Sequence, residues 1–267
     1  MVVFPNCKIN LGLSVLRKRP DNFHDLKTIF YPLPFYDVLE IIQAPVFSMN
    51  QTGIGLDVDA AQNICVRAWQ LLQRDHPQLP QVLIHLHKNI PAGAGLGGGS
   101  ADAAFLLSTV NKKFRLGISH DRLAAYALEL GSDCAFFLVN KPAVATGRGE
   151  ILEPVSLDLS AYRLMVINPS IHVNTGEAFA MITPRDDGPD PEEIISLPID
   201  QWKGRLVNDF EAPVFARHPE VQAVRDKLYD AGALFAAMSG SGSTVFGIFS
   251  KEVPVPVFPA GYLVKVF

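Results

Sequence analysis

Cysteine and tryptophan are scarce in this chain of 267 residues, which contains three of the first and two of the second. The cysteines are odd in number and widely spaced, at Cys7, Cys65 and Cys134. Such spacing suits reduced thiols better than a disulfide framework or a zinc site. We therefore expect no disulfide and no structural metal.

Charged residues and long hydrophobic runs are also limited. Charged residues make up 19% of the chain and the formal net charge is -4. The basic excess typical of proteins that bind nucleic acids or anionic membranes is therefore missing. No apolar run approaches the ~18–20 residues that a membrane-spanning helix needs, and the N-terminus has no basic region followed by a long apolar one. We expect a cytoplasmic protein without nucleic-acid or membrane partners.

Glycine, in contrast, is concentrated between residues 89 and 104, which hold Gly93, Gly95, Gly97, Gly98 and Gly99. Glycine lets the backbone adopt positive φ angles and lets a bulky anion approach its N–H groups. Alternating apolar residues at 82–87 predict a strand before the glycines, and residues 101–107 predict a helix after them, with Ser100 as its N-cap. Because free N–H groups at a helix N-terminus favour negative charge, this segment is predicted to bind phosphate.

Two familiar glycine motifs fit the segment less well. A P-loop of the form Gly-x-x-x-x-Gly-Lys-Ser/Thr requires a lysine before Ser100, where the sequence has Gly99. Residues 93–98 do satisfy Gly-x-Gly-x-x-Gly, but a dinucleotide-binding fold then needs a second strand that ends in an acidic residue about 20 residues on. Residues 121–130 have helical spacing instead. A flexible surface turn is the remaining structural alternative.

Several polar residues permit both a structural and a functional interpretation. Lys8 and Asn10 alternate with apolar residues in the predicted N-terminal strand, whose polar face is usually just solvated. Asp133 precedes an apolar segment, so it is either a helix N-cap or a partly buried carboxylate suited to accepting a proton. Phe23 and His24 are either a core residue beside an exposed ring or a pair that stacks on a planar ligand.

The rest of the chain alternates strands and helices without a regular βαβ order, which predicts an α+β fold. At 267 residues the chain is long enough for one large domain or two medium ones, and we place a boundary in the connection at 152–160, which gives domains 1–155 and 156–267. Strands are expected within 26–42, interrupted by Pro32 and Pro34, and at 143–146, 162–167, 262–267 and on both sides of a glycine turn in 233–249. Helices are expected at 61–74, with Asn63 as a cap or a base contact, and at 121–130, 201–215 and 219–230.

Taken together, the motifs are similar to those of one enzyme superfamily. Residues 91–104, PAGAGLGGGSADAA, resemble the phosphate-binding motif of the GHMP kinases, the superfamily of galactokinase, homoserine kinase and mevalonate kinase, and residues 238–244, MSGSGST, resemble its C-terminal glycine motif. Four further blocks are similar to the branch that acts on cytidine-diphosphate methylerythritol in the non-mevalonate isoprenoid pathway: 7–13 (CKINLGL), 21–24 (DNFH), 131–137 (GSDCAFF) and 208–211 (NDFE). Asn22, Phe23 and Ala135 depart from that branch, which has glycine, tyrosine and proline there.

The resemblance implies a two-domain GHMP kinase fold of the α+β class. Its N-terminal domain would have a mixed or antiparallel sheet and helices, and its C-terminal domain would be α+β. The implied reaction is the ATP-dependent phosphorylation of the 2-hydroxyl of the methylerythritol substrate, with Asp133 as the base and Lys8 as its charged partner. Phosphoryl transfer depends mainly on positioning and electrostatics, so the glycine segment would hold the phosphates and Mg²⁺ would bridge them.

The same resemblance implies the binding residues. Asn10 would contact the substrate near the reacting hydroxyl, Phe23, His24 and Phe179 would hold the cytosine, and Ser100 is a candidate Mg²⁺ contact. The residues implied for ATP are Asn63, Pro91, Ala92, Gly93, Ala94, Gly95, Leu96, Gly97, Gly98, Gly99, Ser100 and Ala101. We expect a monomer or a homodimer. The alternatives are a GHMP kinase for another small alcohol, such as homoserine or a mevalonate derivative, and a nucleotide-binding protein without catalysis.

Overall fold

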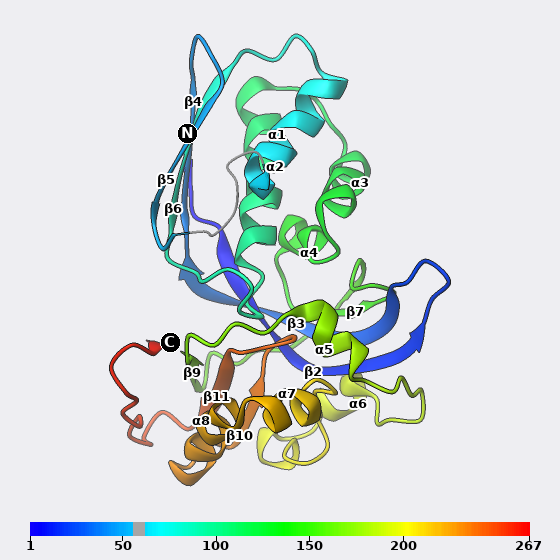
Figure 1. Ribbon diagram of the computed structural model, residues 1–267, viewed down its shortest axis with the longest axis vertical. Helices are drawn as coiled ribbons and strands as arrows, with labels where there is room; N and C mark the ends of the chain where they lie inside the picture. The colour runs from blue at the N-terminus through cyan, green and yellow to red at the C-terminus, as the bar shows by residue number, and fades with distance from the viewer. Residues whose placement is uncertain (56–61) are drawn as a thin grey trace. The chain divides into compact units, whose positions relative to one another are not determined.

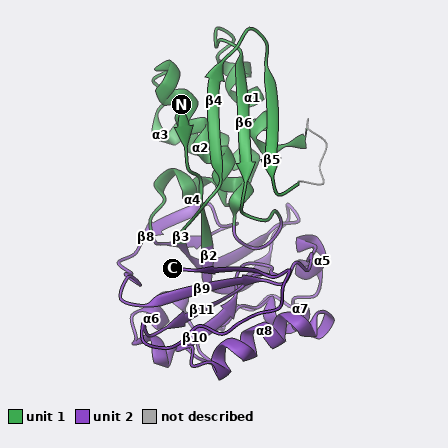
Figure 2. Ribbon diagram, turned by 90° about the vertical axis from the view of Figure 1, so that its left-hand side faces the viewer, with its two compact units in different colours: residues 1–8, 32–92, 97–141 green, residues 9–31, 93–96, 142–267 purple. Residues whose placement is uncertain are grey.

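A computed structural model describes residues 1–55 and 62–267 of the chain (Figure 1). The chain divides into two compact units that are interleaved in sequence (Figure 2). Unit 1 contains residues 1–8, 32–92 and 97–141, and unit 2 contains residues 9–31, 93–96 and 142–267. The continuous domains 1–155 and 156–267 stay a prediction, and residue 61 of the predicted helix 61–74 lies outside the described residues.

Unit 1 combines a four-stranded mixed sheet with helices that lie on one face of it (Figures 1 and 2). The strand order is β1-β4-β6-β5, with β5 parallel to β6 and the other pairs antiparallel. The strands are β1 (Val2–Val3), β4 (Val38–Gln43), β5 (Ser48–Gly53) and β6 (Val82–Lys88). The helices are α1 (Ile64–Asp75), α2 (Gly98–Phe114), α3 (His120–Leu130) and α4 (Cys134–Val139).

Two further sheets supply the strands of unit 2. One has the order β10-β11-β9-β12, and the other has the order β2-β3-β7-β8, with β2 and β3 each contributing residues to both units. The strands are β2 (Asn6–Lys18), β3 (His24–Tyr36), β7 (Ala143–Thr146), β8 (Ile151–Pro154), β9 (Arg163–Asn168), β10 (Phe235–Met238), β11 (Val245–Phe249) and β12 (Leu263–Val266). The helices are α5 (Thr175–Ala180), α6 (Pro191–Ile195), the short 3₁₀ helix η2 (Ile199–Gln201), α7 (Glu211–Arg217) and α8 (Pro219–Asp230).

Most of the expected elements form because local pattern and packing agree. Strand β6 buries its alternate residues Val82, Ile84 and Leu86, as the period of two predicts. Ser119 caps α3 by accepting a hydrogen bond from the backbone N–H of Arg122. Strand β12 is an edge strand, as expected, and the apolar side of α8 belongs to the core of unit 2.

Three local predictions were wrong. Strand β3 continues through Pro32 and Pro34. The two prolines are two residues apart, so the N–H donors that they lack would all lie along the same edge of the strand. The predicted helix at 201–215 is replaced by the end of η2, irregular turns and the start of α7, because Asn208 forms a bridge with Leu13 of β2. The helix after the glycines begins at Gly98, two residues before the predicted cap.

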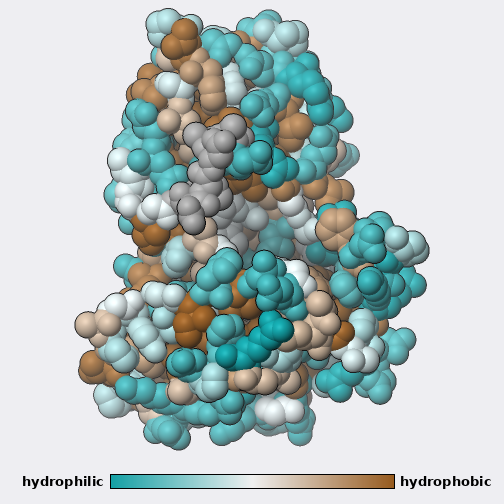
Figure 3. Space-filling model, in the orientation of Figure 1, coloured by the Kyte–Doolittle hydropathy of each residue, from teal (hydrophilic) through white to brown (hydrophobic). Residues whose placement is uncertain are grey.

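The described residues contain no helix that is long and apolar enough to cross a membrane. On the face shown in Figure 3, hydrophilic residues cover most of the surface and hydrophobic residues are scattered among them. All three cysteines are buried free thiols.

Candidate active site

The glycine segment opens helix α2 without a side-chain cap. Gly97 occupies the N-cap position with a φ of 69°, in the left-handed region that favours glycine. Asn63, Ser119, Asn174 and Asp190 in contrast use their side chains to cap α1, α3, α5 and α6. Because the first N–H groups of a helix have no partner inside the helix, the uncapped start of α2 presents donors for an anion.

Lys8 and Asp133 lie beside this helix N-terminus, within unit 1. The Nζ of Lys8 is 3.2 Å from Oδ2 of Asp133, and the Lys8 side chain is only 4% exposed while that of Asp133 is 35% exposed. A β-carbon added to Gly97 would lie 3.0 Å from Cε of Lys8 and 3.0 Å from Cζ of Phe137. The absence of a side chain at Gly97 therefore lets the start of α2 lie directly against the lysine.

The structural interpretations of Lys8 and Asp133 do not hold. Lys8 was to be solvated on the polar face of a strand, but it is buried, as is Asn10. Asp133 stands at the N-cap position of α4, yet its side chain makes no capping hydrogen bond and pairs with Lys8 instead. Burying an ammonium group is costly unless it is paired, and Asp133 supplies the partner of Lys8 here.

Ser100 lies in the first turn of α2 and interacts with Cys134 at the start of α4. Burial raises the pKa of the Cys134 thiol to about 12, and the nearby Ser100 side chain acts in the opposite direction. No group of three or more His, Cys, Asp or Glu residues that could hold a metal ion occurs in the described part of the chain.

Residues 93–96 of the glycine segment belong to unit 2, where the turn between β10 and β11 holds them. The Ser239 hydroxyl donates to the carbonyl of Gly95 at 2.8 Å, and the backbone N–H of Thr244 donates to the carbonyl of Ala94 at 3.3 Å. Gly95 has a φ of 79°, and a β-carbon on it would overlap the carbonyl oxygen of Ser239. The backbone N–H of Asn10 donates to the Ser239 hydroxyl at 3.1 Å, which adds Asn10 to this arrangement.

The aromatic residues implied for a base divide into two contacts, both in unit 2. His24 and Phe179 stack with their ring centroids 4.8 Å apart and an interplanar angle of 11°. Phe23 is 47% exposed, and the guanidinium of Arg148 lies 3.5 Å from the centroid of its ring. Burial, together with the charge of Lys18, lowers the pKa of His24 below its usual 6.5, so the ring is neutral near pH 7.

Sequence reasoning missed Arg148 and the part played by Asn208. The Nδ2 of Asn208 donates to the carbonyls of Met238 and Gly240, at 2.8 Å each, and so fixes the turn that holds residues 93–96. Asn208 was recognised only as part of a similar block. Its contacts span 30 and 32 residues of sequence, so no local pattern indicates them.

Asn63 is found in its structural role. Its Oδ1 accepts the backbone N–H of Cys65 at 2.9 Å as the N-cap of α1, and its Nδ2 donates to Gln51 at 3.3 Å. The cap that the sequence predicted is thereby confirmed, while the contact with a base stays a prediction.

Comparison with known proteins shows the family. Residues 63–141 match the family described as GHMP kinases N terminal domain, and residues 199–256 match GHMP kinases C terminal. A relative from Parabacteroides distasonis, named 4-diphosphocytidyl-2-C-methyl-D-erythritol kinase, is 50% identical over 94% of this chain and 92% of its own. The chain belongs to this family of GHMP kinases. A relative of the same name from Bacteroides fragilis is 47% identical over 94% of this chain and 93% of its own.

Solved structures of GHMP kinases agree with the fold. A crystal structure described as 4-(cytidine 5'-diphospho)-2C-methyl-D-erythritol kinase is 34% identical, with a TM-score of 0.78 over 93% of this chain and 90% of that one. A homoserine kinase from Cytophaga hutchinsonii, 18% identical, has a TM-score of 0.63 over 98% and 94% of the two chains, which shows the fold alone. The predicted α+β, two-domain GHMP kinase fold is confirmed.

Proposed function

We propose that this chain transfers the γ-phosphoryl group of ATP to the 2-hydroxyl of 4-diphosphocytidyl-2-C-methyl-D-erythritol, in the non-mevalonate route to isoprenoid precursors. The names of relatives that are 47–50% identical over 94% of the chain support this substrate. Within the molecule, one observation carries the proposal: the buried Lys8 pairs with Asp133 at 3.2 Å beside the uncapped start of α2.

The chemistry needs a proton acceptor, and Asp133 has the position and exposure for it. Its carboxylate is one-third exposed, so a substrate hydroxyl can reach it, and its partner Lys8 is fixed in the interior. In the proposed step Asp133 accepts the hydroxyl proton as the oxygen attacks the γ-phosphorus. The ammonium of Lys8 then offsets negative charge that develops on the transferring oxygens, which is the main source of catalysis in phosphoryl transfer.

The start of α2 fits the phosphates of ATP. The start of α2 has no side-chain cap and carries the positive end of the helix dipole, and Gly97 there lies close to the Lys8 side chain. We propose that residues 91–101 hold ATP, and that Asn63 contacts the adenine. Mg²⁺ supplies additional charge neutralisation when it is bound with ATP, and Ser100 is its proposed contact.

The aromatic contacts of unit 2 fit recognition of a base. A centroid separation of 4.8 Å leaves no room for another ring between His24 and Phe179, so a cytosine would stack on an outer face of the pair. Phe23 and the Arg148 guanidinium above it form the second planar surface. Asn10 is proposed to contact the substrate near its reacting hydroxyl.

The test is ADP release in a coupled assay with Mg-ATP and, in turn, 4-diphosphocytidyl-2-C-methyl-D-erythritol, homoserine and phosphomevalonate. We expect turnover with the cytidyl substrate alone, and its loss in Asp133→Asn. Asp121→Asn is the matched control, because Asp121 is an exposed carboxylate in the first turn of α3. Turnover with another alcohol would support phosphoryl transfer but refute the proposed substrate. ATP binding without turnover of any alcohol would indicate a nucleotide-binding protein without catalysis.

Light scattering of the same sample decides between the proposed monomer and homodimer.

A further inference from the structure

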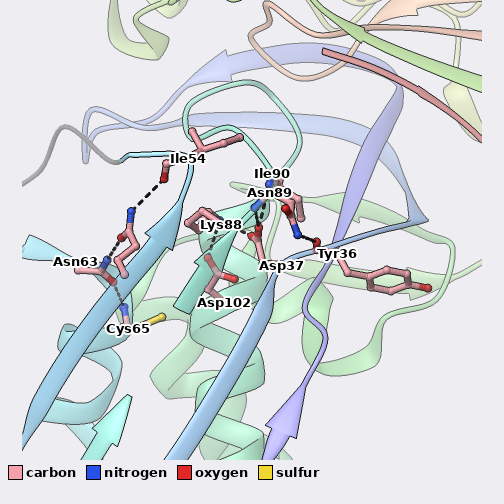
Figure 4. A network of polar contacts seen from close by, with 10 residues as sticks. Tyr36, Asp37, Ile54, Asn63, Cys65, Lys88, Asn89, Ile90 and Asp102 are labelled. Carbon is pink, nitrogen blue, oxygen red and sulfur yellow. Dashed lines mark hydrogen bonds and ion pairs between the residues drawn. The ribbon is translucent and has the colours of Figure 1, made fainter. Parts of the chain in front are cut away.

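A buried group of charges lies at the base of the glycine segment in unit 1 (Figure 4). Asp37 follows β3, Lys88 ends β6 and Asp102 stands in α2, and their exposed fractions are 0%, 1% and 1%. The Nζ of Lys88 donates to Oδ2 of Asp37 and, at 2.7 Å, to Oδ2 of Asp102. One cation therefore joins two carboxylates from different elements, in what we call the Lys88 cluster.

The cluster fixes the backbone where the glycine segment begins. The second oxygen of Asp37, Oδ1, accepts the N–H of Asn89 at 2.6 Å and the N–H of Ile90 at 2.9 Å. The side-chain amide of Asn89 also donates to the carbonyl of Tyr36, at 2.9 Å. These three hydrogen bonds all come from Asn89 and Ile90, the two residues that precede Pro91. The position of Asp37 therefore constrains the backbone of these two residues.

The cluster also lies against the residue at which the segment ends. A β-carbon added to Gly98 would lie 2.7 Å from Cγ2 of Ile90 and 3.4 Å from Nζ of Lys88. The entrance of the segment and the first residue of α2 are thus in direct contact, and Asp102 connects the next turn of α2 to the same lysine. The intervening residues 91–97 form a loop that is closed at its base by the Lys88 cluster.

The stability of the fold does not by itself account for such a cluster. It has a formal charge of -1 in the interior, and Oδ1 of Asp102 is buried without a hydrogen-bond partner among the described residues. Well-packed hydrophobic residues commonly replace buried ion pairs with no loss of stability. Oxygen acceptors in fixed geometry are needed, however, to orient the backbone N–H groups and the lysine simultaneously.

We propose that Asp37, Lys88 and Asp102 are positioning residues for the phosphate-binding loop, and set its geometry for ATP from underneath. This proposal rests on the proposed function, because it takes residues 91–101 as the ATP site. The cluster acts through the backbone at 89–90 and at the start of α2. Its loss is therefore expected to weaken ATP binding more than it changes the chemical step.

The chain offers variants that separate positioning from folding. Asp37→Asn keeps the shape of the side chain but has one acceptor oxygen, whereas Asp37 uses one oxygen for Lys88 and the other for the backbone N–H groups of residues 89 and 90. The substitution therefore disturbs the loop. Asp102→Leu removes the oxygen that accepts the hydrogen bond of Lys88. Asp102→Asn retains that oxygen and replaces Oδ1, which has no hydrogen-bond partner among the described residues, by an amide NH₂ group. Asp75→Asn is the matched control, because Asp75 also accepts several side-chain hydrogen bonds in unit 1, from Arg74, Arg122 and Tyr126.

Steady-state kinetics with ATP varied gives the decisive readout. We expect Asp37→Asn and Asp102→Leu to raise the KM for ATP by about tenfold or more while kcat and the KM for the alcohol change by less than about threefold. Asp102→Asn and Asp75→Asn are expected to stay within about twofold of the wild-type KM for ATP. An unchanged KM for ATP together with a lower unfolding midpoint in Asp37→Asn and Asp102→Leu would reduce the cluster to a structural role and overturn the proposal.

Direct titration with a fluorescent ATP analogue keeps this test independent of turnover. If the wild type binds the analogue but phosphorylates none of the alcohols, the proposed function fails, while the ranking of the variants still decides on positioning. If Asp37→Asn does not fold, the comparison of Asp102→Leu with Asp102→Asn decides. Equal affinity of these two variants for the analogue would contradict the proposal.

Discussion

Two neighbouring glycines at the start of α2 differ sharply in what surrounds them. A β-carbon on Gly98 would lie 2.7 Å from Cγ2 and 3.0 Å from Cβ of Ile90, which is fully buried, whereas one on Gly99 would meet only Ile64, at 3.9 Å. Replacing glycine by alanine in a helix stabilises it by about 0.5–1 kcal/mol. We expect this gain in Gly99→Ala. In Gly98→Ala the stiff, branched Ile90 has to move, which costs about 1–3 kcal/mol.

The propensity gain is common to both variants, so it cancels when they are compared. Gly98→Ala is therefore expected to have a free energy of unfolding about 1–3 kcal/mol below that of Gly99→Ala. Urea denaturation measures the difference, and a Trp202→Phe background lets the fluorescence of Trp69 in α1 report on unit 1 alone. Equal stability of the two variants would refute the close packing of the loop entrance on α2. A lower free energy of unfolding than the wild type in both variants would indicate that any side chain at the start of α2 is unfavourable, whatever its contact with Ile90.

Three further predictions concern the site and its surroundings. Asp133→Asn is expected to lower kcat by at least about 100-fold, with the KM for ATP little changed, because a positioned proton acceptor contributes about 10²–10⁴ in rate. A kcat near that of the wild type would show that Asp133 is not the base. The pKa of His24 is lowered in the folded state, so the unfolded state binds more protons as the pH falls. The contribution of neutral His24 to stability is therefore full above pH 6.5 and is lost at lower pH. His24→Gln should flatten the pH dependence of the urea midpoint between pH 5 and 7, and an unaltered slope would contradict this. Burial raises the pKa of all three thiols, so a disulfide reagent should label none in the native chain and three in urea; rapid native labelling of one thiol would contradict their burial.

Local chemistry made much of the site predictable. The glycine segment, the strand before it and the helix after it follow from composition and period, because those signals lie within 26 consecutive residues, 82–107. The functional interpretation of Asp133 followed from its apolar neighbours together with a resemblance of several motifs. Within these residues the start of α2 was misplaced, since Ser100 is a good cap in isolation but Gly97, which packs against Lys8, occupies the N-cap position in a left-handed conformation.

The rest depends on residues that are distant in sequence. Lys8 looked like a solvated strand residue, and nothing near it indicates the partner that makes its burial tolerable. Asp37 and Lys88 are 51 residues apart, so their pairing leaves no periodic signal. The same holds for Asn208, whose backbone bridge with Leu13 interrupts a helix that the spacing favoured and whose side chain donates to Met238 and Gly240. Such contacts become visible only when the chain is folded.

The interleaving of the two units has a consequence for synthesis on the ribosome. All of unit 1 lies within the first 141 residues, so it can be completed while the rest of the chain is still being made. Residues 9–31 emerge early and can form the β2–β3 pair, but they belong with 142–267, and the strand that pairs with β3 on its other side, β7, follows only at Ala143–Thr146. A gene cut at residue 155 would leave β2, β3, β7 and β8 together on one fragment and separate Leu13 of β2 from Met165 and Phe210, which share its core. The two fragments would then have to associate before that core could form.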